Sequence, residues 1–209
     1  SATLTDHEHP EYTDIFDQAT VNFDEKRKLT ETIGKAMGRT EDQIIIDTAI
    51  AGTYNTTATD GEGFSIAAGG TGFTVAKLRA LRAYYDDLEV EEDVCIVVSG
   101  TGMSSLLANA ELTSTDTNTV RALVGGQADS YMGFTFKTVG ARRLEGGLGG
   151  SGLVAYSWAP NAIGMASGSI EKSMSVDWIP ERVSYLCNGM LKAGSTIIDP
   201  EGTAKIAFA

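Results

Sequence analysis

The chain has 209 residues, of which 42% are hydrophobic and 21% charged, as in a folded protein rather than a disordered one. Its 16 lysines and arginines against 28 aspartates and glutamates give a net charge of −12, which argues against a protein that coats nucleic acid through phosphate contacts. The longest apolar runs, such as residues 94–98, are too short to span a bilayer, and the polar residues 1–10 lack the apolar core of a secretory signal.

Cysteine and histidine are too scarce for most catalytic or metal-binding arrangements. Cys95 and Cys187 each lie in a hydrophobic run, and we interpret them as small core side chains on strands rather than a disulfide or a metal pair. The only histidines, His7 and His9, lie together in a polar N-terminal segment that we expect to be a mobile tail, with no third ligand nearby. We therefore expect no metal site, no Ser-His-Asp catalytic triad and no Cys-His catalytic pair.

Residues 24–50 are predicted to form one long helix, because apolar side chains recur there at spacings of three and four. A continuous helix of this length would extend about 40 Å at 1.5 Å per residue. Gly34 and Gly38 lie inside it and predict either close packing of another element or a bend near Gly38. Gly52 is the predicted C-cap.

The remaining chain alternates between short helices and strands. Residues 53–72 are rich in threonine, alanine and glycine and predict a loop or an irregular hairpin. Thr74 is predicted to cap a helix whose apolar face carries Val75, Leu78, Leu81 and Tyr85. The predicted strands are 94–99, 132–139, 153–158, 169–178, 183–192 and 203–208, with further helices over 101–109 and after Ser114.

One motif suggests a nucleotide site. Residues 147–152, Gly-Leu-Gly-Gly-Ser-Gly, satisfy the pattern GxGxxG, but a dinucleotide site needs a strand before this run and a helix opening from it. Here a strand follows instead, and we interpret 146–152 as an inter-strand loop. The sequence also places no two carboxylates where the pKa of one would be raised for general acid–base catalysis. We therefore expect no catalytic residue, no cofactor and no enzymatic activity.

Several segments, taken in order over about residues 14–194, resemble the major capsid proteins of tailed bacteriophages, the family with the HK97 fold. Ala36-Met37-Gly38-Arg39-Thr40-Glu41-Asp42-Gln43-Ile44-Ile45 is similar to the end of that family's long spine helix. Family members carry a longer segment before this helix, and residues 197–209 fit the family pattern poorly. The other similar segments are 74–79, 94–99, 112–116, 118–124, 132–136, 158–164 and 179–183.

The resemblance implies an α+β fold with a spine helix, a peripheral-domain sheet and an axial domain of mixed sheet with flanking helices. We expect a peripheral domain over 1–73 with the spine helix at about 24–50, an axial domain over 74–180, and a return into the peripheral domain over 181–209. The implied function is mechanical, with many copies forming the pentamers and hexamers of an icosahedral virion shell. An acidic chain suits a container that encloses double-stranded DNA without sequence-specific binding.

The same resemblance implies further expectations about partners and contacts. We expect no membrane partner, synthesis in the cytoplasm of the host bacterium, and portal, scaffold or decoration proteins as possible neighbours. The candidate subunit-interface residues are Arg39, Glu41 and Asp42 on the helix, with Arg142 and Arg143 as a further charged pair. Two alternatives stay open: a non-viral shell protein of the same fold, and a cytoplasmic nucleotide-binding α/β enzyme that uses the 146–152 loop.

Overall fold

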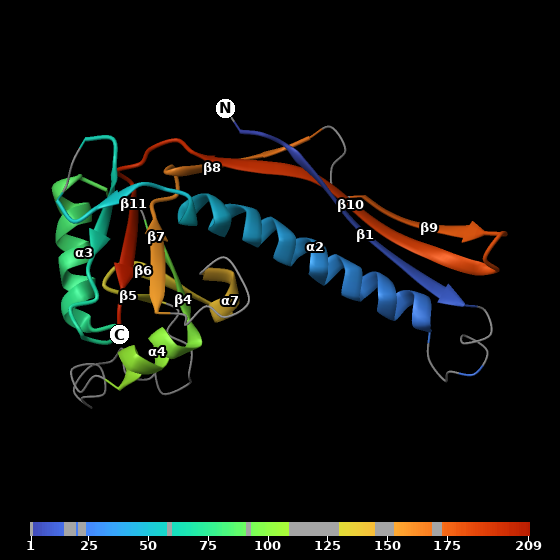
Figure 1. Cartoon of the computed structure of the whole chain (residues 1–209), viewed down its shortest axis with the longest axis horizontal. Coiled ribbons are helices and arrows are strands. Elements are labelled where there is room, and N and C mark those ends of the chain that lie inside the picture. Colours follow the sequence, from blue (N-terminus) through green and yellow to red (C-terminus); the bar gives the residue numbers. More distant parts are fainter. Residues whose placement is uncertain are drawn as a thin grey trace. The chain divides into compact units, whose positions relative to one another are not determined.

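The computed structural model describes residues 2–14, 20, 24–57, 60–90, 93–108, 130–144, 153–168 and 173–209 (Figure 1). The chain divides into two compact units, each assembled from segments distant in sequence. Unit 1 comprises Ser1–Ile45 and Met165–Thr196, and unit 2 comprises Ile46–Gly164 and Ile197–Ala209. We describe each unit by itself.

Unit 1 is built on a long antiparallel strand, β10 (Ser184–Ile197), with partners on both edges. On one edge, β1 (Thr5–Asp14) pairs antiparallel with β10 through all ten of its residues. On the other edge lie β8 (Ile163–Ser167) and β9 (Ser173–Ile179), the latter antiparallel over seven residues. The sheet therefore has one continuous central strand that fixes the register of the others.

The predicted long helix is confirmed as α2 (Glu25–Ile50), a continuous helix of 26 residues. Its first part, up to Ile45, belongs to unit 1, where Ile33 and Met37 are buried against β10. Gly34 and Gly38 are not sites of close packing. A Cβ at Gly34 would make only an ordinary contact of 3.7 Å with Met174 Cε, and among the described residues no atom outside the adjoining residues and the backbone of the helix itself lies within 4 Å of one at Gly38. The helix also continues through Gly38 instead of ending or breaking there.

The close approach between helix and sheet is made instead by Gly189 on β10. A Cβ at this position would lie 2.5 Å from Met37 Sδ and 2.6 Å from Ile33 Cγ2, far inside van der Waals contact. We expect Gly189→Val to lower the free energy of unfolding by about 1–3 kcal/mol through overpacking, measured by urea denaturation of the subunit. Gly38→Ala is the control, since a methyl group there meets open space and alanine favours a helix. Equal stability of the Gly189→Val variant and the wild type would show that α2 moves away from the sheet without cost.

The N-terminal segment was expected to be a mobile tail, and this prediction is wrong for residues 5–14, which form β1. Its side chains are mostly exposed, so composition alone gave no sign of a strand. Pairing along ten residues of β10 supplies the backbone hydrogen bonds that hold it. His9 Nε2 lies 3.1 Å from Thr40 Oγ1 on α2, and His7 Nε2 lies 2.9 Å from Thr5 Oγ1.

Unit 2 contains a seven-stranded mixed sheet in the order β2-β3-β11-β7-β4-β6-β5. Inside this sheet, β4 (Val94–Ser99) is parallel to β6 (Phe134–Val139) and antiparallel to β7 (Val154–Trp158). The other strands are β2 (Tyr54–Asn55), β3 (Gly63–Ile66), β5 (Ser130–Tyr131) and β11 (Thr203–Ala207), and the helices are α3 (Val75–Asp87), α4 (Gly100–Leu107) and α7 (Ala141–Leu144).

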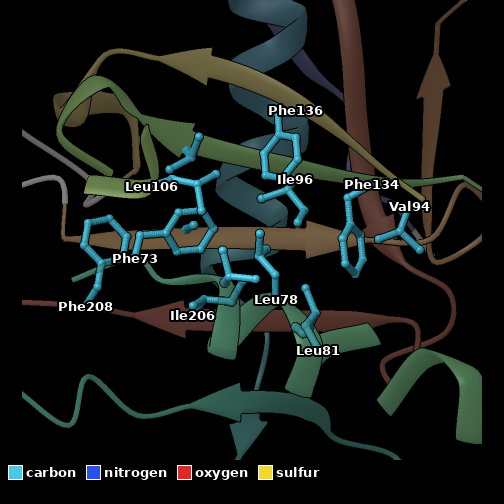
Figure 2. Packing of buried hydrophobic residues seen from close by; sticks show 14 of the residues in the cluster. Phe73, Leu78, Leu81, Val94, Ile96, Leu106, Phe134, Phe136, Ile206 and Phe208 are labelled. Atoms are coloured by element: carbon cyan, nitrogen blue, oxygen red, sulfur yellow. The ribbon is translucent and has the colours of Figure 1, made fainter. Parts of the chain in front are cut away.

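Both faces of β4 are covered, which explains its uninterrupted apolar sequence. Alternate side chains, Val94, Ile96 and Val98, join the main core with α3 and α4, and Figure 2 shows this packing. Val97, on the opposite face, joins a second cluster with Ile46 from the end of α2 and Leu144 from α7. The main core contains Phe73, Val75, Leu78, Leu81, Tyr84, Tyr85, Val94, Ile96, Val98, Met103, Leu106, Phe134, Phe136, Ala155, Ala204, Ile206 and Phe208.

Residues 53–72 differ from the predicted loop or irregular hairpin. They contain β2 and β3, which pair in parallel, so they do not form a hairpin. β3 also pairs in parallel with β11, close to the C-terminus. Gly52 precedes them and is needed for space: a Cβ there would lie 2.9 Å from Tyr54 Oη and 3.0 Å from Ile197 Cδ1. It does not have the positive φ of a left-handed C-cap.

The compact units also differ from the domain boundaries expected from sequence. Residues 46–73 and 197–209 were assigned to the peripheral domain, but they belong to unit 2 because β2, β3 and β11 complete its sheet. Residues 165–180, assigned to the axial domain, belong to unit 1 because β9 pairs with β10. The predicted helix after Ser114 and the 146–152 loop lie outside the described residues.

Candidate subunit interface

Charged side chains follow one exposed face of α2. Spacings of three and four residues place them in a row on a helix of 3.6 residues per turn, opposite Ile33 and Met37, which pack on β10. All five members of this row, which we call the α2 charged face, belong to the part of α2 in unit 1 and are exposed: Lys28, Glu31, Lys35, Arg39 and Asp42.

Ion pairs link the N-terminal half of the α2 charged face. Lys35 Nζ donates a hydrogen bond to Glu31 Oε1 at 2.7 Å, and Lys28 Nζ lies 3.5 Å from Glu31 Oε2. The hydrogen bond from Lys35, followed by the charge of Lys28, lowers the pKa of the Glu31 carboxyl below its usual 4.5. These side chains are about half exposed or more, so the pairs order the surface rather than stabilise the fold. The result is a pre-arranged charge pattern on an accessible helix.

The candidate residues are distributed over both units. Arg39 and Asp42 are exposed on α2, whereas Glu41 is half-buried at the side of the helix. Arg142 and Arg143 lie in unit 2 on α7, where Arg142 is exposed and Arg143 half-buried. Sequence reasoning missed Lys28, Glu31 and Lys35, although their spacing to Arg39 and Asp42 was a signal that could have identified the face.

The surroundings of the 146–152 loop do not match a dinucleotide site. The four-residue helix α7 precedes it and β7 follows it, whereas the site requires the reverse order of strand and helix. A buried polar cluster is present in unit 2, in which Tyr85 Oη lies 3.0 Å from Ser157 Oγ. Burial raises the pKa of the Tyr85 hydroxyl, so this group stays protonated as a structural hydrogen-bond partner.

The cysteines and histidines form no recognisable reactive site in the part of the chain that the structure describes. Both cysteines are free thiols on strands: Cys187 is buried and Cys95 half-buried, and burial raises the pKa of each thiol. Among the described residues, no group of three or more His, Cys, Asp or Glu side chains is arranged to hold a metal ion. None of the described helices has an apolar stretch long enough to cross a bilayer.

Solved structures that share this architecture include phage capsids. The chain matches a structure of Mycobacterium phage Che8 with a TM-score of 0.73 at 16% identity, over 97% of this chain and 70% of that one. The capsid of cyanophage P-SCSP1u matches with a TM-score of 0.72 at 16% identity, over 100% and 73%. A virus-like particle from Pyrococcus furiosus matches with a TM-score of 0.59 at 11% identity, over 97% and 75%.

These likenesses define the fold as that of a capsid protein, the α+β architecture expected from the sequence. The chain belongs to the phage capsid protein family, which it matches over residues 1–209. It is therefore a structural subunit of a phage shell, and oligomeric assembly follows from that role. No curated protein matches the chain.

Proposed function

We propose that copies of this chain form the pentamers and hexamers of an icosahedral phage head that encloses double-stranded DNA. The family match over the whole chain is the observation that carries this proposal. The net charge of −12 supports a container role, because a shell with strong affinity for DNA would hinder packing and release. In this proposal unit 1 is the peripheral domain and unit 2 the axial domain, synthesis takes place in the host cytoplasm, and portal, scaffold and decoration proteins are further partners.

The proposal is tested by isolating particles formed by the purified chain, or by a longer natural form of it, and imaging them by electron microscopy. Closed shells with fivefold and sixfold capsomers are the expected result. Sedimentation only as a monomer or dimer at high concentration would contradict it. Because a shell wall acts mechanically, addition of nucleotides is expected to leave the melting temperature unchanged.

A non-viral shell protein of the same fold is the second candidate. The likeness to the virus-like particle from Pyrococcus furiosus supports it, since a shell from a cellular organism shares this architecture. The contents of particles isolated from the native source separate the two candidates. Double-stranded DNA inside supports the phage head, whereas a protein cargo supports the alternative.

The α2 charged face provides a direct prediction about assembly. We expect Arg39→Glu to yield a folded subunit, judged by circular dichroism, that assembles poorly or into aberrant shells, because charges across an interface set register and partner choice. Arg79→Glu, the same change at an exposed position of α3, is the matched control and should assemble normally. Normal shells from the Arg39→Glu variant would remove this residue from the interface and leave the shell function intact.

A further inference from the structure

The two histidines of the chain lie on one face of β1 in unit 1. They are two residues apart, and alternation along a strand places both side chains on the same face. His7 pairs with Leu191 and His9 with Gly189, two positions of β10 that face α2. Both histidines are half-buried. The fold therefore brings two imidazole rings to one face of the strand, at a place that solvent still reaches.

A hydrogen bond to α2 fixes the tautomer of His9. Its Nε2 atom lies 3.1 Å from Thr40 Oγ1. The Thr40 hydroxyl has a single proton, which it donates to Ala36 O at 3.1 Å, so its oxygen can only accept a hydrogen bond from the imidazole. The proton of neutral His9 is therefore on Nε2, and Nδ1 carries the free lone pair.

His7 is held in the same way by a threonine of its own strand. Thr5 Oγ1 donates to Ala193 O at 3.2 Å and accepts from His7 Nε2 at 2.9 Å. Among the residues that the structure describes, no hydrogen-bond partner meets Nδ1 of His7 or of His9. Each ring thus combines a hydrogen bond from Nε2 with an unused basic nitrogen, which is the arrangement of metal-ligating histidines in proteins.

A groove beside His9 leaves room for the water that a bound ion carries. It lies between β1 and α2, has a volume of about 240 Å³ and is lined on the β1 side by Glu8, His9, Pro10 and Glu11. This volume is enough for several water molecules. Glu8 and Glu11 are exposed, and their carboxylates together with the net charge of −12 attract cations to this edge of the sheet.

We propose that His7 and His9 bind one divalent transition-metal ion through their Nδ1 atoms, with water in the remaining coordination positions. Imidazole nitrogen is a preferred ligand of Zn²⁺, Ni²⁺ and Cu²⁺, whereas Mg²⁺ and Ca²⁺ prefer oxygen. The two Cα atoms are about 7 Å apart along the strand, close enough for both rings to reach one ion at Zn–N distances of about 2.0–2.1 Å. The expectation of no metal site rested on the lack of a third protein ligand, which a hydrated surface site does not need. This site is independent of the proposed shell function.

Calorimetric titration of the purified subunit with Zn²⁺ tests the site. We expect one ion per subunit, an affinity that falls as the pH is lowered because protons compete for Nδ1, and no displacement by a large excess of Mg²⁺. His7→Gln and His9→Gln should each weaken binding severalfold. Absence of binding, or binding that Mg²⁺ abolishes, would overturn the proposal, because the ion would then be held by surface carboxylates or not at all.

Exchange of two neighbouring residues tests whether the shared face of β1 matters. The double variant Glu8→His with His9→Glu keeps the composition and the net charge but places the two histidines on opposite faces of the strand. It should bind Zn²⁺ as weakly as the single variants, with a circular dichroism spectrum like that of the wild type. Wild-type affinity of the exchanged variant would contradict the proposal, because the histidines would then bind without chelating one ion.

Thr40 is a positioning residue for this site, because it fixes the tautomer of His9 without ligating the ion. Thr40→Val removes the acceptor of the Nε2–H bond and should weaken Zn²⁺ binding by about 10- to 100-fold. Thr30→Val is the matched control, since Thr30 Oγ1 makes the same bond to the carbonyl four residues earlier, Lys26 O at 2.8 Å, and should leave the affinity unchanged. Equal affinities of the two variants would overturn the role assigned to Thr40.

Discussion

Leu78→Ala is expected to lower the free energy of unfolding by about 2–5 kcal/mol. Leu78 is fully buried at the centre of the main core of unit 2, where α3 packs on the sheet (Figure 2). Truncation removes apolar contacts on all sides and leaves a cavity that surrounding side chains fill only in part. Urea denaturation of the subunit, monitored by circular dichroism, measures the difference.

Leu107→Ala is the matched control for this experiment. Unlike Leu78, Leu107 lies at the last turn of α4 and is only half-buried against the core. Its truncation should therefore cost clearly less than that of Leu78. A loss below about 0.5 kcal/mol at Leu78 would contradict the helical phase of α3, because only surface positions tolerate truncation so well.

The elements that could be predicted from sequence are those whose pattern is local. α2 and α3 show apolar side chains at helical spacing, and β4 shows a short apolar run with β-branched residues. The predicted inward face of α3, with Val75, Leu78, Leu81 and Tyr85, is fully buried in the structure. These patterns follow from burial on one face or on both, and they do not require knowledge of the partner strand.

The elements that could not be predicted depend on pairing with distant residues. β1 has an exposed, charged sequence and exists because β10, about 180 residues away in the chain, provides its partner. β2 and β3 are short, and their place in the sheet depends on β11 at the other end of the chain. The two compact units divide the chain differently from the expected domains at these segments for the same reason, because sequence order does not show which sheet a short strand completes.

The candidate interface was partly predictable. The resemblance to capsid proteins drew attention to Arg39, Glu41 and Asp42, and the structure places two of these three on the exposed face of α2. The ion pairs around Glu31 escaped notice because scattered charges on a helix usually indicate only a solvated surface.

Lys77 is a buried cation that nothing in its sequence context predicted. It lies on α3 with only 8% of its surface exposed, and its ammonium donates three hydrogen bonds to backbone carbonyls. The acceptors are Ala68 O at 2.9 Å, Thr71 O at 3.0 Å and Ala207 O at 2.9 Å. Burial lowers the pKa of this ammonium below 10.5. One side chain thus joins the segment before α3 to the end of β11.

We expect Lys77→Met to lower the free energy of unfolding by about 3–5 kcal/mol, because methionine keeps the apolar stem but leaves three carbonyl groups without their charged donor. Lys137→Met, at an exposed position of β6, is the control and should change stability little. Urea denaturation gives the magnitude. Hydrogen exchange locates the effect, because the Ala209 amide that donates to Thr71 O at 3.0 Å should lose protection first. Wild-type stability and unchanged protection in the Lys77→Met variant would show that water replaces the ammonium and that the C-terminal strand is held by its sheet pairing alone.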